Sequence, residues 1–413
     1  MAATLAQSFA LVLRLWRAEG ARSLLDRWLD RRLDARRAAR FRVLPGATPG
    51  AGSQTLWVLP FALHRRRGGA AIQLLVRLEE LARDRPVALL HRLPDRLRCE
   101  VWGHGAGSPL AREWPVPAPE AWAAIVIEAA RWARAERVHF ESLVDLAADL
   151  PLAVRAGGYA CGLSAHDFAL FCPRPHLIEE PAGRFCGFSA DPGRCARCLE
   201  ASWPLPAGFQ ERRRAIMAEA IAAADRLEFP SEYMRREHQT LFPGIDPARS
   251  CVVPPRSLAG PLASPARSVL RPPQRIAFAG AVHRHKGAVE FEQLVRQLEG
   301  LRPGAFEWHV FGGGDTQLLA RLRALPRTRV HGYYRAGALP ARLRAAKIDL
   351  VVLPSIWPEA HCLVLDECAA AGVPALAFDL GALGERIRAG GLGAVIDPRA
   401  GAAGLAAHIA ALG

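Results

Sequence analysis

Short apolar runs alternate with helical patterns along most of this chain, in two successive series. In the first series, runs that indicate buried strands occupy residues 56–61, 87–90 and 138–140, and helical patterns occupy residues 69–81, 120–134 and 209–226. In the second series, the strand patterns occupy residues 275–279, 308–311, 348–353 and 373–378. Strands that alternate with helices in this way predict parallel sheets covered by helices on both faces, so we expect an α/β fold.

A stretch rich in Pro, Ser, Ala and Arg, residues 256–273, separates the two series and is typical of a hinge. We therefore expect two Rossmann-like, doubly wound domains with a cleft between them. The expected parts are a basic helical segment and linker at 1–50, an N-terminal domain at 51–262 with a Cys-rich insert at 172–198, and a C-terminal domain at 263–413.

The composition is that of a globular protein with a large excess of arginine. Of the 413 residues, 51% are hydrophobic and 23% are charged, and the formal net charge is +14. Lys286 and Lys347 are the only lysines. The charge favours anionic partners such as sugar phosphates, lipid head groups or polyphosphates. Aromatic residues are few and do not interleave with the basic stretches as base-stacking platforms would, which argues against a nucleic-acid partner.

The basic segment at 1–50 carries leucines at roughly helical spacing between arginines. Such a helix would either lie on an anionic membrane surface or pack on the body of the protein. No apolar run reaches the roughly 18 residues that cross a bilayer, and no signal-peptide pattern precedes the nine cysteines. We therefore expect a cytoplasmic protein with reduced thiols, for which the inner face of the plasma membrane is a peripheral contact.

Loops suited to ligands follow three strands of the second series. The loop after the first strand is basic, and its Arg284 and Lys286 would neutralise a diphosphate, arginine as a bidentate fork and lysine as a point charge. After the next strand comes Gly312-Gly313-Gly314. Glycines there would let a nucleotide approach the backbone, or would simply form a tight turn.

The third loop, residues 354–367, places two carboxylates eight residues apart. Glu359 lies in the loop, and Glu367 lies in the first turns of a helix that starts near Cys362. In open α/β sheets ligands bind beyond the carboxyl ends of the strands, and helix N-termini favour anions. The two carboxylates would thus accept hydrogen bonds from the hydroxyls of a ligand. The phosphate of that ligand would face the free backbone amides between the two glutamates. The alternative is an ordinary loop with two surface glutamates.

The order and spacing of the three loops, followed by a G-x-P, resemble the donor half of the family 4 (group 1) glycosyltransferases of the B-type fold (GT-B). The W-P-E of the third loop looks like a branch that builds bacterial O-antigens and surface polysaccharides. The resemblance implies two Rossmann-like domains that face a central cleft, with the acceptor on the N-terminal domain. Where relatives often have Phe-Gly after the first glutamate, this chain has Ala360-His361-Cys362, which leaves the donor open.

Carried over residue by residue, the resemblance assigns a role to each motif. The residues that it brings to the donor are Arg284 and Lys286 at the diphosphate, Glu359 at the sugar, Glu367 at the ribose, and the backbone of Gly312, Gly313, His361, Cys362 and Leu363. On the acceptor side, Gly68-Gly69 resembles a turn that lines the cleft. His166, in an H-D that precedes C-P-R, would contact the donor sugar or the acceptor; the alternative is that the histidine or the aspartate, Asp167, simply caps the loop. We expect Glu359, His166 and Lys286 in the catalytic site.

Four cysteines gather in the insert of the first domain: Cys172, Cys186, Cys195 and Cys198. The last two form a C-x2-C knuckle, and four thiolates are a familiar ligand set for structural zinc. Intervening glycines and prolines would let the insert wrap a metal without a core of its own. Free buried thiols are the alternative, as is a disulfide in an exported protein.

The resemblance implies a retaining hexosyltransferase (EC 2.4) that uses a UDP-, GDP- or dTDP-linked sugar, and we expect a lipid-linked glycan as acceptor. A D-x-D flanked by apolar strand residues is missing, so a catalytic divalent metal is not expected. Three alternatives remain open: a nucleotide-sugar epimerase of the same fold, a basic zinc-knuckle protein that binds nucleic acid, and a member of the fold that is inactive or requires a partner.

Overall fold

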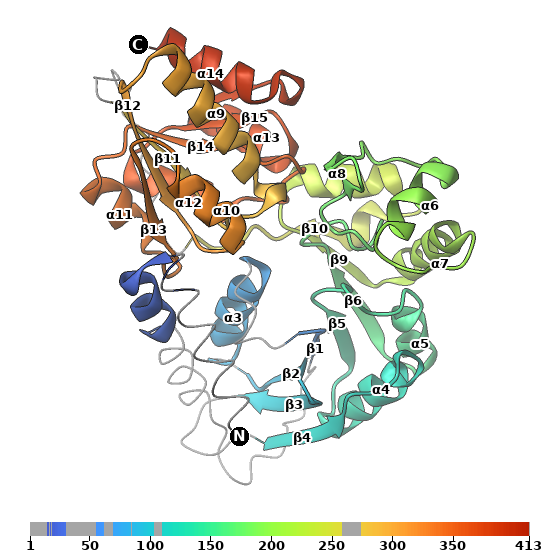
Figure 1. Ribbon diagram of the computed structural model, residues 1–413. Coiled ribbons are helices and arrows are strands. Elements are labelled where there is room, and N and C mark those ends of the chain that lie inside the picture. The colour runs from blue at the N-terminus through green and yellow to red at the C-terminus, as the bar shows by residue number, and fades with distance from the viewer. Residues whose placement is uncertain are drawn as a thin grey trace, which may run out of the picture. The chain divides into compact units, whose positions relative to one another are not determined.

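The computed structural model describes residues 15, 17, 19–29, 55–61, 69–83, 85–102, 110–257 and 274–412. The chain divides into two compact units (Figure 1). The N-terminal unit is Leu33–Arg256, and the C-terminal unit is Ser257–Gly413 together with Met1–Arg32. The predicted divisions between residues 50 and 51 and between residues 262 and 263 both lie outside the described residues.

The N-terminal unit contains an eight-stranded sheet in the order β10-β9-β6-β5-β1-β2-β3-β4. Its strands are β1 (Thr55–Leu59), β2 (Val87–Arg92), β3 (Arg96–Trp102), β4 (Leu110–Pro115), β5 (Arg137–Phe140), β6 (Ala160–Ser164), β9 (Arg226–Phe229) and β10 (Ser250–Val252). The strands from β10 to β2 are parallel, whereas β3 and β4 add an antiparallel edge. The apolar runs did not predict this edge, because charged residues alternate with buried ones along β3.

Helices connect the parallel strands of this sheet. They are α3 (Gly69–Leu81), α4 (Trp122–Trp132), α5 (Leu150–Ala156), α6 (Pro192–Glu200), α7 (Phe209–Ala223) and α8 (Glu232–Leu241). The insert also holds a small hairpin of β7 (Ile178–Glu179) and β8 (Arg184–Phe185). Short 3₁₀ turns occupy Pro119–Ala121 and Pro247–Arg249.

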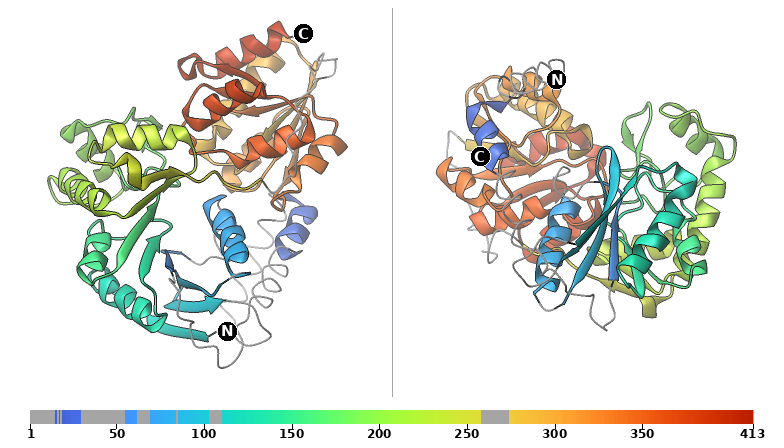
Figure 2. Two further views of the ribbon diagram at one scale, coloured as in Figure 1. Left: turned by 180° about the vertical axis from the view of Figure 1, so that it is seen from behind. Right: turned by 90° about the horizontal axis from the view of Figure 1, so that it is seen from below.

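The C-terminal unit is built on a six-stranded, fully parallel sheet in the order β13-β12-β11-β14-β15-β16. Its strands are β11 (Gln274–Ala279), β12 (Phe306–Phe311), β13 (Thr328–Gly332), β14 (Leu350–Leu353), β15 (Ala375–Phe378) and β16 (Gly393–Ile396). Its helices are α9 (Ala288–Leu301), α10 (Thr316–Arg323), α11 (Leu339–Ala345), α12 (Leu363–Ala371), α13 (Gly381–Gly390) and α14 (Gly401–Ala411), with 3₁₀ turns at Arg284–Lys286 and Pro398–Ala400. Figure 2 shows helices on both faces of this sheet.

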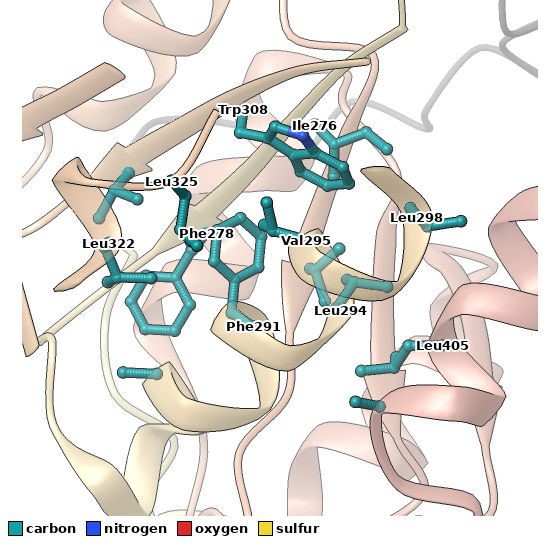
Figure 3. Packing of buried hydrophobic residues seen from close by; sticks show 14 of the residues in the cluster. Ile276, Phe278, Phe291, Leu294, Val295, Leu298, Trp308, Leu322, Leu325 and Leu405 are labelled. Atoms are coloured by element: carbon teal, nitrogen blue, oxygen red, sulfur yellow. The ribbon is translucent and has the colours of Figure 1, made fainter. Parts of the chain in front are cut away.

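Two apolar layers bury both faces of the C-terminal sheet. Along β11, Ile276 and Phe278 face one layer, while Ala277 and Ala279 face the other. In the first layer the Phe278 and Phe291 ring centroids lie 5.6 Å apart (Figure 3). A strand buried on both faces needs apolar residues at every position, not at every second one. This explains why the sequence shows these strands as continuous apolar runs.

Candidate active site

The order of the strands creates a switch point in the C-terminal sheet. β11 and β14 lie side by side, but the chain continues from β11 toward β12 and from β14 toward β15, which lie on opposite sides. The loops that follow β11 and β14 therefore diverge at the carboxyl ends of the strands, and open α/β proteins bind ligands in the crevice formed there. The basic loop and the loop that carries Glu359 are these two loops.

Lys286 and Glu359 meet across this switch point. The Lys286 Nζ lies 2.6 Å from Glu359 Oε1 and 2.8 Å from Oε2. The Ser355 hydroxyl donates a hydrogen bond of 2.6 Å to the same Oε1. Glu359 is only 3% exposed, whereas the Lys286 side chain is 27% exposed. The buried carboxylate thus holds a half-buried ammonium group toward solvent at the carboxyl end of the sheet.

Close packing of the two loops fixes the Lys286–Glu359 pair. Gly287 follows Lys286 with φ of 80°, and a Cβ built there would lie 1.8 Å from the Pro354 carbonyl oxygen. Only glycine lets the basic loop come this close to the end of β14. On the other side, the Glu359 carbonyl accepts a hydrogen bond of 2.8 Å from the Ala382 amide, which ties the carboxylate's backbone to α13.

The helix α12 begins at Leu363, directly after the loop. Cys362 precedes it with φ of 71°, a conformation rarely adopted by a side chain other than Gly or Asn. Arg386 holds this turn, since its Nη1 donates to the carbonyl oxygens of His361 (2.7 Å) and Cys362 (3.2 Å) and its Nη2 pairs with Asp366. Free amides in the first turn of α12 would favour an anion at this end of the helix. Sequence reasoning did not single out Arg386 or Asp366.

Glu367 is buried on α12 and faces the segment that follows β13. It is 8% exposed and accepts a 2.9 Å hydrogen bond from the Gly337 amide. Burial raises the pKa of Glu367 to about 7. Glu359 and Glu367 are therefore both buried, which contradicts the alternative of an ordinary loop with two surface glutamates.

The glycines after β12 serve close backbone packing. Gly312 has φ of 149°, and a Cβ there would lie 1.7 Å from the Gly280 carbonyl oxygen. A Cβ on Gly313 would lie 2.4 Å from Arg27 Nη2 and 2.6 Å from Glu19 Oε1. The side chains of the N-terminal segment thus occupy the space that Gly313 leaves open. Arg284 lies in the basic loop and is exposed.

A second polar site lies within the N-terminal unit. A pocket of about 260 Å³ opens at the carboxyl ends of β5, β6 and β9, and α3 forms one wall. His166 lines it, and its Nε2 lies 2.6 Å from Glu141 Oε1. Burial lowers the pKa of His166, but the carboxylate of Glu141 outweighs burial and raises it above its usual range. The neighbouring Asp167 caps the loop by accepting the Ala169 amide at 2.8 Å, as the capping alternative allowed for the aspartate.

An ion pair closes the other side of this pocket. Glu228 on β9 accepts from Arg77 of α3, with a distance of 3.0 Å from Nη2 to Oε1, and from Arg226 at 2.6 Å. Burial alone would raise the pKa of Glu228, but these partners lower it to about 2. The sequence did carry a signal for Glu141, a carboxylate directly after an apolar strand pattern, whereas Glu228 lies inside β9 between Leu227 and Phe229. Arg77 lies 151 residues from its partner and could not be paired from sequence.

The predicted glycine pair on the acceptor side is only partly described. Gly69 is exposed and is the first residue of α3, whereas Gly68 lies outside the described residues. Gln73 and Arg77, from the same helix, line the pocket. The start of α3 therefore positions this wall, and the side chains that reach the pocket come one and two turns later.

The zinc prediction for the insert is not supported. Among the residues that the structure describes, no group of three or more His, Cys, Asp or Glu is placed to hold a metal ion. The thiols instead bind the backbone, since Cys195 donates to the Ser189 carbonyl and Cys198 accepts from the Glu180 amide, both at 3.4 Å. Burial raises the pKa of the free Cys172 thiol to about 11. Cys172, Cys186, Cys195 and Cys198 line one cavity of about 20 Å³ as free thiols.

No helix in the described ranges combines the length and apolarity needed to cross a bilayer.

Comparisons with known proteins concern the family profile of the C-terminal unit and the fold of the chain. Residues 273–413 match the family profile "Glycosyl transferases group 1". No curated protein sequence matches the chain. Among solved structures, sucrose-phosphate synthase from Thermosynechococcus elongatus is similar, with a TM-score of 0.60 and 16% identity over 87% of this chain and 90% of that one.

Two further solved structures share the fold at low identity. HepE of Anabaena in complex with UDP-glucose gives a TM-score of 0.53 and 16% identity over 87% of this chain and 89% of that one. An α,α-trehalose-phosphate synthase (UDP-forming) from Burkholderia xenovorans gives a TM-score of 0.53 and 13% identity over 87% and 91%. The profile match falls on the unit that carries Lys286, Glu359 and Glu367. Residues 273–413 therefore match the group 1 glycosyltransferases, and the chain shares the two-domain GT-B fold of these solved structures.

Proposed function

We propose that this enzyme transfers a sugar, with retention at the anomeric carbon, from a nucleotide sugar to a lipid-linked bacterial surface glycan. The observation that carries the donor half of the proposal is the Lys286–Glu359 pair at the switch point of the C-terminal sheet. A UDP-linked sugar is the first donor to test, because a similar structure was solved with UDP-glucose. The net charge of +14 suits an anionic lipid carrier and a peripheral contact with the inner membrane face.

In this proposal Lys286 leaves Glu359 in part and binds the donor diphosphate. Its half-exposed ammonium group is already held at the carboxyl end of the sheet, so little reorganisation is needed. The amides at the start of α12 and the exposed Arg284 add positive potential to the same anion. Glu359 then accepts hydrogen bonds from the hydroxyls of the sugar, and Glu367 accepts them from the ribose.

The chemical step that we propose needs no nucleophile from the protein. The bond between the anomeric carbon and the diphosphate oxygen breaks while the acceptor oxygen bonds to that carbon on the same face. The proton of the acceptor hydroxyl passes to the departing diphosphate oxygen. Lys286 stabilises the charge that develops on the diphosphate. Glu359 positions the sugar and favours its positive character.

The pocket of the N-terminal unit is our candidate for the acceptor. His166 lines this pocket with a side chain that is 21% exposed, and the contact of its Nε2 with Glu141 fixes the orientation of the ring. A histidine whose pKa is raised by a buried carboxylate is a good hydrogen-bond donor to a sugar hydroxyl or a phosphate. We therefore assign His166 to acceptor contact.

A panel of donors tests the proposed function. The purified chain is mixed with UDP-, GDP- and dTDP-sugars, with and without a lipid-linked acceptor, and nucleotide release is measured. We expect release from one donor, faster when acceptor is present. Release that ignores the acceptor would favour an epimerase-type or hydrolytic reaction. No release and no nucleotide binding would contradict the donor site itself.

The raised pKa of Glu367 predicts a pH dependence of donor binding. Below its pKa of about 7 the carboxyl is protonated and accepts fewer hydrogen bonds from the ribose. The Kd for the nucleotide should therefore rise by about tenfold as the pH falls from about 8 to about 6, as titration calorimetry would show. Glu367→Gln should bind more weakly at high pH and lose this dependence. A wild-type Kd that stays constant over the range would contradict the role of Glu367.

A further inference from the structure

The described N-terminal segment, residues 19–29, packs on the C-terminal unit with a polar face. Glu19, Ser23 and Asp26 are 2%, 0% and 9% exposed, and their spacing places them on one side of the helical segment. On the other side Leu25 is 54% exposed and Trp28 is 47% exposed. A helix that docks for stability normally buries its apolar side. Here the buried contacts are hydrogen bonds and ion pairs, which recognise a specific surface.

The surface that they recognise is the carboxyl end of β13. The amide of Tyr333, the first residue after this strand, donates to Ser23 Oγ at 3.1 Å and to Glu19 Oε2 at 3.3 Å. Arg27 donates to both Glu19 oxygens, at 2.6 and 2.7 Å from Nη2, and its guanidinium carbon lies 4.4 Å from the Tyr333 ring centroid. Asp26 forms an ion pair with Arg342 of α11.

Two glycines of the sheet provide the space for the segment. A Cβ on Gly332 would lie 2.4 Å from the Glu19 carbonyl oxygen and 2.8 Å from Ser23 Cβ. A Cβ on Gly313 would meet Arg27 and Glu19 at 2.4 and 2.6 Å. Gly313 does not need glycine for its backbone angle, because its φ lies outside the left-handed range. Its missing side chain is accounted for by the close approach of the segment.

The segment of residues 19–29 lies at the same end of the sheet as the proposed donor site. β12 and β13 end there beside β11, and the Gly313 carbonyl accepts a 3.0 Å hydrogen bond from Val282 of the basic loop. The residues after Tyr333 run to Gly337, whose amide binds Glu367. The segment thus lies at the carboxyl ends of the strands, toward the edge strand β13. The predicted contacts to the diphosphate and the ribose lie on its other side. A nucleotide base that extends from those contacts along the carboxyl ends would reach the Tyr333 amide.

We propose that residues 19–27 are an internal competitor of the nucleotide sugar, an inference that rests on the proposed donor site. The Glu19 carboxylate and the Ser23 hydroxyl take the Tyr333 amide that a base would otherwise use, and the segment fills the space beside Gly313 and Gly332. Donor binding requires the segment to leave. The apparent affinity for nucleotide is then reduced by the fraction of molecules in which the segment is docked.

Calorimetric titration of the full chain with UDP, GDP and dTDP tests the competition. Glu19→Ala and Asp26→Ala each remove docking contacts, and Leu25→Ala on the exposed side of the same segment is the matched control. We expect the two docking variants to bind nucleotide about tenfold more tightly than the wild type, and the control to bind as the wild type does. Hydrogen exchange of residues 19–29 should become faster when nucleotide is added to the wild type.

The possible outcomes distinguish a failure of this inference from a failure of the proposed donor site. If the wild type binds a nucleotide and the docking variants bind it equally or more weakly, the segment is not a competitor and the donor site stands. If nucleotide slows exchange in residues 19–29, the segment is part of the binding site and the inference is overturned. If neither wild type nor variants bind any nucleotide, the inference and the donor site fall together.

Discussion

Glu359→Gln should lower the rate of sugar transfer by about a hundredfold to a thousandfold while leaving the chain folded. Removal of one preorganised electrostatic contact at a reacting centre typically has an effect of this size. The glutamine retains the shape of the side chain but loses the charge that holds Lys286 and that would favour a positive sugar. Because Glu359 is 3% exposed, water cannot replace it. The rate is measured as acceptor-dependent nucleotide release at saturating donor.

A double-mutant cycle with Lys286→Ala shows whether the two residues act together. Since the ammonium group lies 2.6 Å from the carboxylate, we expect the double variant to be little slower than the slower single variant. Glu307→Gln is the control, because this glutamate pairs with Arg275 on the surface near the start of β11 and β12. Transfer rates of the Glu359→Gln and Glu307→Gln variants that agree within threefold would contradict the assigned site.

Glu228→Ala should lower the free energy of unfolding of the N-terminal unit by about 3–5 kcal/mol. The substitution removes the acceptor of both Arg77 and Arg226 and leaves the half-buried Arg77 guanidinium without its carboxylate, a cost that a surface pair does not carry. Urea unfolding of the full chain, followed by hydrogen exchange in β6 and β9, gives the stability of this unit separately from that of the other.

A surface ion pair in the same sheet provides the matched comparison. Glu113 on β4 accepts from Arg98 at 2.9 Å and is 37% exposed. Glu113→Ala should cost less than about 1 kcal/mol, because exposed pairs are screened by solvent. Equal losses for the two variants would mean that the buried charge at β9 is not held by its ion pairs.

Much of the fold could be predicted because the parallel sheets are buried on both faces, so that each of their strands appears in the sequence as an apolar run. The runs predicted β1, β2 and β5 in the first sheet and β11, β12, β14 and β15 in the second. The edge strands β3 and β4 were missed, because each has one face in solvent and alternates apolar with charged residues. Parallel sheets put strand ends on one edge, so the meeting of Lys286 with Glu359 could be expected from their loops alone.

Other features of the site depend on contacts between residues far apart in the sequence. The sequence motif marked Gly313 as a residue for ligand approach, yet in the structure the side chains of Arg27 and Glu19 fill the space beside it. The spacing of the cysteines indicated a metal, but the sulfur atoms of Cys195 and Cys198 form hydrogen bonds with backbone groups. Neither result could be read from spacing, because spacing does not specify which distant segment packs against a motif.

The location of the nucleotide is tested most directly by hydrogen exchange of the full chain with and without the nucleotide that the donor panel identifies. Binding at the switch point of the C-terminal sheet predicts slower exchange in residues 280–287 and 355–367, and loss of this protection in Lys286→Ala. Protection confined to the pocket of the N-terminal unit, around Gln73 and Arg77, with residues 355–367 unchanged, would contradict it.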